Sequence, residues 1–209
     1  MSVVKLLSRI VAPETELHGN GSNEFAALHD HTYGITSDPL TQFSVILSAL
    51  IHDLYHPGVT NAVLTKENSK IATLYKNKSV AEQKSVDDAW QLLMNPAFVK
   101  LRGAIYSNSE EYNRFRHLVV NCVMATDIMD KDLSAARKAR WEAAFMDQAE
   151  GDFSQLAVNR KATIVIEHLI QASDVVHTMQ HWVSSQDKCS VALQSMKGGS
   201  NRSFSLFSA

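Results

Sequence analysis

Apolar residues recur every three or four positions along most of this 209-residue chain. This helical period is the feature that most limits the fold classes open to the chain. No segment shows the strict alternation of apolar and polar residues that is typical of a half-buried strand. The sequence also contains no internal repeat and no glycine-rich phosphate-binding loop. We therefore predict an all-α fold, a compact multi-helix bundle.

Capping residues and chain breaks mark the expected helices. Asp38-Pro39 predicts a helix start, because Asp caps a helix and Pro fits its first position. That helix delivers His52-Asp53 near its end and stops at Pro57-Gly58. Residues 79–82, Ser-Val-Ala-Glu, form a capping box that predicts another helix start. Further helices are expected over residues 1–11, 61–75, 110–126, 130–146 and 159–182, the last with Ile164, Ile166, Leu169, Ile170 and Val175 buried.

The character of the sequence changes at Val183, where the helical period stops. The last 27 residues hold eight serines together with Gly198-Gly199. A segment of this composition cannot bury enough apolar surface to offset the entropy of ordering it. We predict one domain over residues 1–183 and a disordered tail over residues 184–209.

Composition and charge exclude several classes of protein. The 20 basic and 22 acidic residues leave a formal net charge of -2, which gives no field to gather nucleic acid or anionic lipid. Cys122 and Cys189 fit neither a zinc-knuckle nor a disulfide-framework spacing. No stretch approaches the ~20 apolar residues that span a bilayer, and Lys5 and Arg9 interrupt the N-terminal apolar run. We expect no nucleic-acid partner, no membrane span, and a location in the cytoplasm or in the cytosolic part of a membrane protein.

The sharpest local feature is a histidine–aspartate pair at the end of an apolar helix. His52-Asp53 is followed by His56 and then by Pro57-Gly58, which exposes this helix end. An imidazole nitrogen beside a carboxylate oxygen can ligate one metal ion, and a carboxylate can bridge two. For the pair taken alone, helix capping plus a buried histidine is the alternative interpretation.

Two further carboxylates lie in or after apolar helices. Asp127 follows one apolar run and Asp174 lies within another. Because burying an unpaired carboxylate is costly, each of them needs a partner. Local capping or pairing would satisfy each one singly, whereas three acids and two histidines at the ends of apolar helices together indicate a metal site.

These motifs resemble the metal-binding signature of class I 3',5'-cyclic nucleotide phosphodiesterases, within the HD-type metal phosphohydrolase superfamily. The signature reads His52-Asp53-x-x-His56-Pro57-Gly58-x-x-Asn61, and blocks at residues 68–82, 124–129 and 169–174 follow in the family's order. The Pro-Gly-x-x-Asn and Tyr-x-x-x-Ser-Val-x-Glu blocks distinguish the chain from general HD phosphohydrolases. The resemblance spans about residues 38–182, and it implies that the helices form a partial catalytic domain of the phosphodiesterase type.

The resemblance implies a metal centre. His52, Asp53 and Asp174 match three of the four protein ligands of a first cation, usually Zn²⁺. Asp53 would bridge to a second cation, usually Mg²⁺ or Mn²⁺. Two cations close together lower the pKa of a bridging water molecule, whose hydroxide attacks phosphorus in line.

The resemblance also implies catalytic positions and a substrate. His56, Glu82 and Asp127 match positions that orient the metal ligands and the water molecules of the centre. The implied activity is metal-dependent hydrolysis of cAMP or cGMP to a 5'-nucleoside monophosphate in signal transduction.

The chain departs from the family's pattern at both ends. The His-Asn-x-x-His block that supplies the general acid and the fourth metal ligand is absent, as is the glutamine that binds the purine. We therefore expect a domain truncated at both ends, with impaired hydrolysis. His29-Asp-His31 is a weaker candidate ligand pair, and His177 and His181 share a helix face with Asp174.

Two alternatives to an active enzyme stay open. The chain could be a catalytically dead phosphodiesterase remnant that acts as a binding or regulatory module. It could also be an incomplete gene model of a larger receptor-type or cyclase-linked protein. Bound metal would argue against the catalytically dead remnant. A transcript that extends upstream through a His-Asn-x-x-His block would indicate an incomplete gene model.

Overall fold

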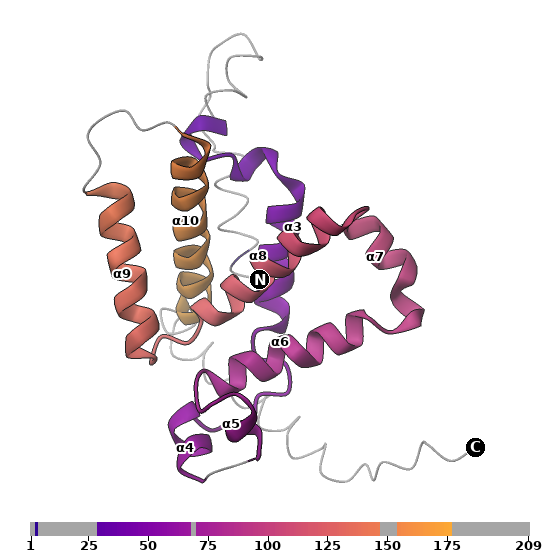
Figure 1. Ribbon diagram of the computed structural model, residues 1–209, viewed down its shortest axis with the longest axis vertical. Helices are drawn as coiled ribbons and strands as arrows, with labels where there is room; N and C mark the ends of the chain where they lie inside the picture. The colour runs from indigo at the N-terminus through magenta and orange to yellow at the C-terminus, as the bar shows by residue number, and fades with distance from the viewer. Residues whose placement is uncertain (1–2, 4–28, 68–69, 147–153, 177–209) are drawn as a thin grey trace, which may run out of the picture. The chain divides into compact units, whose positions relative to one another are not determined.

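The computed structural model describes residue 3 and residues 29–67, 70–146 and 154–176. Over these residues the chain forms helices and no strand, which confirms the all-α prediction. The elements in chain order are η1 (Ile35–Ser37), α3 (Pro39–Ile51), α4 (Asn61–Lys66), α5 (Lys70–Leu74), α6 (Val80–Leu93), η2 (Pro96–Phe98), α7 (Val99–Ile105), α8 (Ser109–Ala125), α9 (Lys131–Phe145) and α10 (Gln155–Val175) (Figure 1).

The chain divides into two compact units, Met1–Asp174 and Val175–Ala209. The predicted serine-rich tail over residues 184–209 lies outside the described residues, as does the helix expected over residues 1–11 apart from the helical, buried Val3. Within the described part of the chain, no helix has the length and apolar character needed to cross a membrane.

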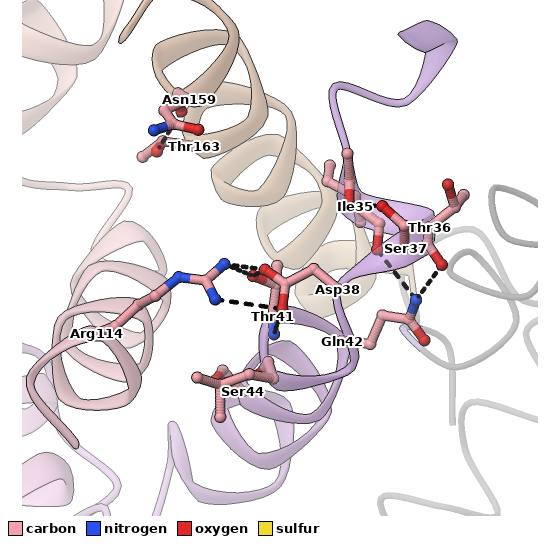
Figure 2. Close-up of polar contacts among 12 residues, drawn as sticks. Ile35, Thr36, Ser37, Asp38, Thr41, Gln42, Ser44, Arg114, Asn159 and Thr163 are labelled. Atoms are coloured by element: carbon pink, nitrogen blue, oxygen red, sulfur yellow. Dashed lines mark hydrogen bonds and ion pairs between the residues drawn. The ribbon is translucent and has the colours of Figure 1, made fainter. Parts of the chain in front are cut away.

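Helix α3 begins as the sequence predicts. The Asp38 side chain accepts a hydrogen bond from the Thr41 backbone N–H at 3.3 Å, and Pro39 occupies the first helical position. The Asp38 carboxylate also pairs with Arg114 of α8, whose guanidinium donates to Thr41 Oγ1 at 3.2 Å (Figure 2). The start of α3 is therefore fixed to α8, along which α3 packs.

Two clusters of buried apolar side chains share α3. One cluster joins α3 to α8 and α10, and the other joins α3 to α6 and α8. The first contains Val3, Ile35, Val45, Cys122, Ala125, Ile166 and Ile170, and the second contains Ile51, Val86, Phe115, Val119 and Val123. Because α3 contributes to both clusters, it packs with α10 through the first cluster and with α6 through the second.

The capping box predicted at the start of α6 is wrong. Ser79 has a φ of 39° in the left-handed region and its side chain makes no capping hydrogen bond. Among the described residues, its Oγ is a buried polar atom without a hydrogen-bond partner. An N-cap side chain reaches the helix amides from an extended backbone, which Ser79 does not adopt. The N–H of Ala81 instead donates to Asn61 Oδ1 at 2.9 Å.

The last described helix starts earlier than predicted, and its predicted end at residue 182 lies outside the described residues. α10 begins at Gln155, four residues before the predicted start at residue 159, and is described to Val175. Ile164, Ile166 and Ile170 are buried as expected, but Val175 is 39% exposed, so the expectation that it is buried is wrong. Leu169 is partly buried against the first cluster.

Candidate functional site

His52 follows the last turn of α3, and its side chain is 20% exposed. Its Nδ1 lies 3.0 Å from the Ala49 carbonyl oxygen, and since a carbonyl only accepts, Nδ1 carries the proton. Nε2 lies 3.3 Å from Asp53 Oδ2 and 3.3 Å from Asp174 Oδ1. The structure thus brings together His52, Asp53 and Asp174, the three residues for which metal ligation was expected.

The two carboxylates dominate the electrostatics of His52. Hydrogen bonds to Asp174 and then Asp53 raise the pKa of His52 to about 10, although burial acts in the opposite direction. The hydrogen bond to His52 lowers the pKa of Asp53. Without a metal ion, a proton on Nε2 therefore supplies the positive charge that the two carboxylates favour.

The direct contacts leave the three side chains in an ion-paired arrangement. Among the described residues, no group of three or more His, Cys, Asp and Glu side chains is placed to hold a metal ion. The donor types are nevertheless those of a mixed nitrogen and oxygen site, with one imidazole nitrogen and two carboxylate oxygens. The ring is oriented through Nδ1–H and a backbone carbonyl, which is a common arrangement for a histidine that ligates a metal through Nε2.

A second group of polar side chains centres on Asn61, the first residue of α4. Its Nδ2 donates to Glu82 Oε2 at 2.8 Å and to Asp127 Oδ2 at 3.2 Å. Burial raises the pKa of Glu82, and the hydrogen bond from Asn61 opposes that effect. Glu82 and Asp127, two of the expected catalytic residues, are therefore brought together by a third side chain.

Asp127 has the hydrogen-bond partners that a buried carboxylate needs. Asp127 as a whole residue is 6% exposed, and its Oδ1 accepts from the backbone N–H groups of Met129 and Asp130, each at 3.2 Å. Its carbonyl accepts from Arg137 Nη2 of α9 at 3.3 Å. Asp127 thus pairs both within its own turn and, through Asn61, with the first turn of α6.

The other histidines considered as site candidates have different surroundings. His56 is exposed, and its Nδ1 accepts from the Gly58 N–H at 3.1 Å. Its electrostatic influence acts to lower the pKa of both Asp53 and Glu82, in Glu82 against the larger rise that burial causes, so His56 lies within electrostatic range of both groups. His29 bonds to Ser37 Oγ and lines a cavity of about 870 Å³ between η1, α8 and α10. His177 and His181 lie outside the described residues.

Two polar residues of the site region had no role assigned from sequence. Asn61 was part of the quoted signature, and that membership was the only signal for it. Gln171 donates from Nε2 to the Ala125 carbonyl at 2.8 Å and so ties α10 to the end of α8, two residues before Asp127. No sequence pattern marks Gln171, because a single amide in a helix is compatible with any surface position.

A comparison with protein families decides the assignment. Residues 24–199 match the family model described as 3'5'-cyclic nucleotide phosphodiesterase. The chain belongs to this phosphodiesterase family. The family membership inferred from the His52-Asp53 signature is therefore confirmed, and the matched region corresponds to part of a phosphodiesterase catalytic domain.

Curated relatives share the phosphodiesterase region over part of their length. A probable 3',5'-cyclic phosphodiesterase, pde-6, of Caenorhabditis elegans is 27% identical over 172 residues, which are 82% of this chain and 19% of the relative. The cGMP-inhibited 3',5'-cyclic phosphodiesterase 3A of Mus musculus is 32% identical over 118 residues, 53% of this chain and 10% of the relative. The chain therefore spans a fifth or less of the length of these relatives.

A solved phosphodiesterase structure has the same fold. The structure of LmjPDEB1 in complex with IBMX superposes with a TM-score of 0.56 at 23% sequence identity. The match covers 76% of this chain and 46% of that one. At this identity the similarity shows the fold, which is helical as predicted.

Proposed function

We propose that the chain supplies metal-dependent hydrolysis of 3',5'-cyclic nucleotides, cAMP or cGMP or both, to 5'-nucleoside monophosphates in signal transduction. The observation that carries this proposal is the convergence of Asp53 and Asp174, which come from distant parts of the sequence, on Nε2 of His52. Family membership supports the substrate class, since a human relative is named as high affinity and cAMP-specific and a mouse relative as cGMP-inhibited.

The donor set supports a binuclear centre. In the proposal, His52, Asp53 and Asp174 would hold a first cation, Zn²⁺, and Asp53 would also bridge to a second, Mg²⁺ or Mn²⁺. Asp53 suits the bridging role because its side chain is 67% exposed and one of its oxygens already faces Nε2. When bound, the cations supply a water molecule of lowered pKa and stabilise negative charge on the phosphoryl oxygens.

Protein side chains around that centre orient the metal ligands and carry protons. The Ala49 carbonyl holds the His52 ring through Nδ1–H, so that Nε2 keeps its direction. Glu82 and Asp127 accept hydrogen bonds from Asn61, and burial raises the pKa of Glu82, which favours the protonated form of this carboxyl. His56 completes the proposed catalytic set as an exposed imidazole near both carboxylate groups.

We further propose that the 209-residue chain alone turns over cyclic nucleotides weakly. No His-Asn-x-x-His block occurs in the sequence, so the chain offers three of the four expected ligands of the first cation and no matching general acid. Losing an acid catalyst costs about 10² to 10⁴ in rate. We therefore expect the chain to bind metal detectably even though it hydrolyses cyclic nucleotides slowly.

Bound metal, measured by elemental analysis of the purified chain, tests the proposal. We expect Zn²⁺ or Mn²⁺ in the unmutated chain and its loss in Asp53→Ala and Asp174→Ala. Asp132→Ala is the matched control, because that carboxylate is 82% exposed and pairs with Lys78 outside the site. Slow cAMP or cGMP hydrolysis should disappear in the same two variants. No metal in any version would reject the proposal and favour a non-catalytic binding module.

A further inference from the structure

We propose that the groove between α9 and α10 is a binding site for a phosphate monoester that carries a planar ring. The groove has a volume of about 350 Å³, which lies within the ~300 to 1,000 Å³ typical of small-molecule sites. Its described lining includes none of the residues expected to bind metal or to take part in catalysis. Binding at this groove therefore goes beyond the proposed function and requires no metal ion.

The groove is positively charged. Arg137 and Lys138 of α9 line it, and none of its described lining residues is acidic, although acidic residues outnumber basic ones in the chain. Arg137 Nη2 donates to the Asp127 carbonyl at 3.3 Å. That acceptor is neutral, so it orients the guanidinium without cancelling its charge, and a guanidinium binds phosphate through two parallel hydrogen bonds.

The two glutamates next to groove residues in the sequence do not neutralise the groove. Glu142 lies 3.9 Å from Lys138, but both side chains are exposed, at 51% and 78%, and such a pair is weak. Glu167 is 5% exposed and lies 2.8 Å from Arg140, which compensates its charge. The charges of Arg137 and Lys138 therefore remain available to a dianion, and a phosphate monoester carries about -1.5 to -2 at pH 7.

Trp141 gives the groove an aromatic wall. Its ring centroid lies 4.6 Å from that of Phe145 and 5.0 Å from that of His168, so two neighbouring rings hold it in place. Trp141 is nevertheless 37% exposed and lines the groove. An aromatic side chain that is already fixed loses little entropy when a planar ring stacks on it.

Polar groups on both helices complete the lining. Ser134 of α9 adds a hydroxyl, which can donate to a phosphate oxygen. Gln171 of α10 donates from Nε2 to the Ala125 carbonyl at 2.8 Å, so its carboxamide is fixed while Oε1 can accept from a ligand N–H. A dianion joined to a planar ring with N–H groups satisfies this set, and a nucleoside monophosphate has that chemistry.

Isothermal titration calorimetry of the full chain in EDTA tests the groove without a metal ion. The probes are phenyl phosphate, AMP and inorganic phosphate. We expect the first two to bind more tightly than inorganic phosphate, because only they place a ring on Trp141. Trp141→Leu should weaken both about fivefold or more and leave inorganic phosphate unchanged. Asp53→Ala should bind all three probes as the unmutated chain does.

Charge variants test the other half of the site. Arg137→Gln combined with Lys138→Gln should weaken all three probes about tenfold or more, because hydrogen bonds to charged groups are lost. Lys66→Gln combined with Lys100→Gln is the matched control, since it removes the same charge from two exposed side chains outside the described lining. Lys138→Gln alone, at a side chain that is 78% exposed, covers the case in which circular dichroism shows the double variant to be unfolded.

Three results would overturn the proposal. The first is no binding of phenyl phosphate or AMP at millimolar concentration, and the second is an equal loss in the Lys66 and Lys100 control. The third is a phosphotyrosine peptide that binds at least tenfold more tightly than AMP, which would assign the groove to a protein partner. A chain that binds AMP in EDTA but neither binds metal nor hydrolyses cyclic nucleotides would reject the proposed function alone.

Discussion

At the scale of single residues, Ser79 combines two unfavourable features. Its φ of 39° lies in the left-handed region, which costs a residue with a Cβ about 1 to 2 kcal/mol. Its buried Oγ makes no hydrogen bond among the described residues. Unfavourable conformations of this kind concentrate near functional sites, and Ser79 lies three residues before Glu82.

Replacing Ser79 with glycine should stabilise the chain. Glycine adopts positive φ without a steric cost, and this gain exceeds the ~0.5 to 1 kcal/mol of entropy that glycine adds to the unfolded state. We expect Ser79→Gly to raise the free energy of unfolding by about 1 kcal/mol in urea denaturation. Ser79→Ala is the control that removes the hydroxyl and keeps the Cβ. A glycine variant less stable than the alanine variant would contradict the strain argument.

The thiol of Cys122 should be inert in the folded chain. Cys122 is 1% exposed in the first cluster, and burial raises its pKa to about 12. The thiolate that reacts with disulfide reagents is therefore scarce at pH 8. In a Cys189→Ser background, we expect no labelling by a thiol reagent in buffer and complete labelling in urea. Rapid labelling of the native chain would show that the α3–α8–α10 cluster opens readily.

At the scale of elements, α9 is tied to α10 by a partly buried ion pair. Arg140 Nη2 lies 2.8 Å from Glu167 Oε2, and the Glu167 side chain is 5% exposed. Arg140→Ala leaves that carboxylate buried without its partner, at a cost of about 1 to 3 kcal/mol in the free energy of unfolding. Adding Glu167→Gln should recover much of the loss. Lys138→Ala, which removes a surface pair with Glu142, should cost under about 0.5 kcal/mol.

The sequence predicts the long helices well because their patterns are local. Asp38-Pro39 starts α3 as expected, and α8 and α9 begin and end within one residue of the predicted ranges. The capping-box prediction at residues 79–82 failed because the same residue spacing is compatible with a backbone conformation that turns the Ser79 side chain away from the helix amides. α7 has only seven residues, too few for a periodic pattern to distinguish it from a loop.

At the scale of the whole molecule, the candidate site depends on contacts that no local pattern encodes. The motif marks His52, Asp53 and Asp174 by their residue types, yet only the packing of α3 against α10 brings Asp174 to Nε2. Asn61 was visible in the signature, but its bonds reach residues 20, 21 and 66 positions away. Such long-range polar contacts follow from the tertiary fold, so their partners could not be read from the sequence.

The His52 contacts also make the stability of the metal-free chain depend on pH. The pKa of His52 is about 10 in the folded chain and 6.5 in the unfolded one, so its contribution is complete below pH 6.5. It declines as the pH rises from 6.5 and is lost above about 10. The lowered pKa of Asp53 adds stability above pH 3.8, which is lost as the pH falls. With EDTA present, urea denaturation should show a free energy of unfolding that falls from pH 6 to pH 8 and pH 10. His52→Gln should flatten this decline. His117→Gln is the control and should preserve the decline, because His117 is exposed.

In the proposed metal centre, the same proton would compete with a metal ion for Nε2. A cation could use this nitrogen only after the proton leaves, so each metal ion bound at His52 near neutral pH would release one proton. We therefore expect the apparent affinity for Co²⁺ to rise about tenfold per pH unit between pH 6 and 8, and saturating metal to remove the loss of stability toward high pH. Titration calorimetry in buffers of different ionisation enthalpy measures the released proton directly. Binding without proton release would mean that the metal ion does not occupy the position between His52, Asp53 and Asp174.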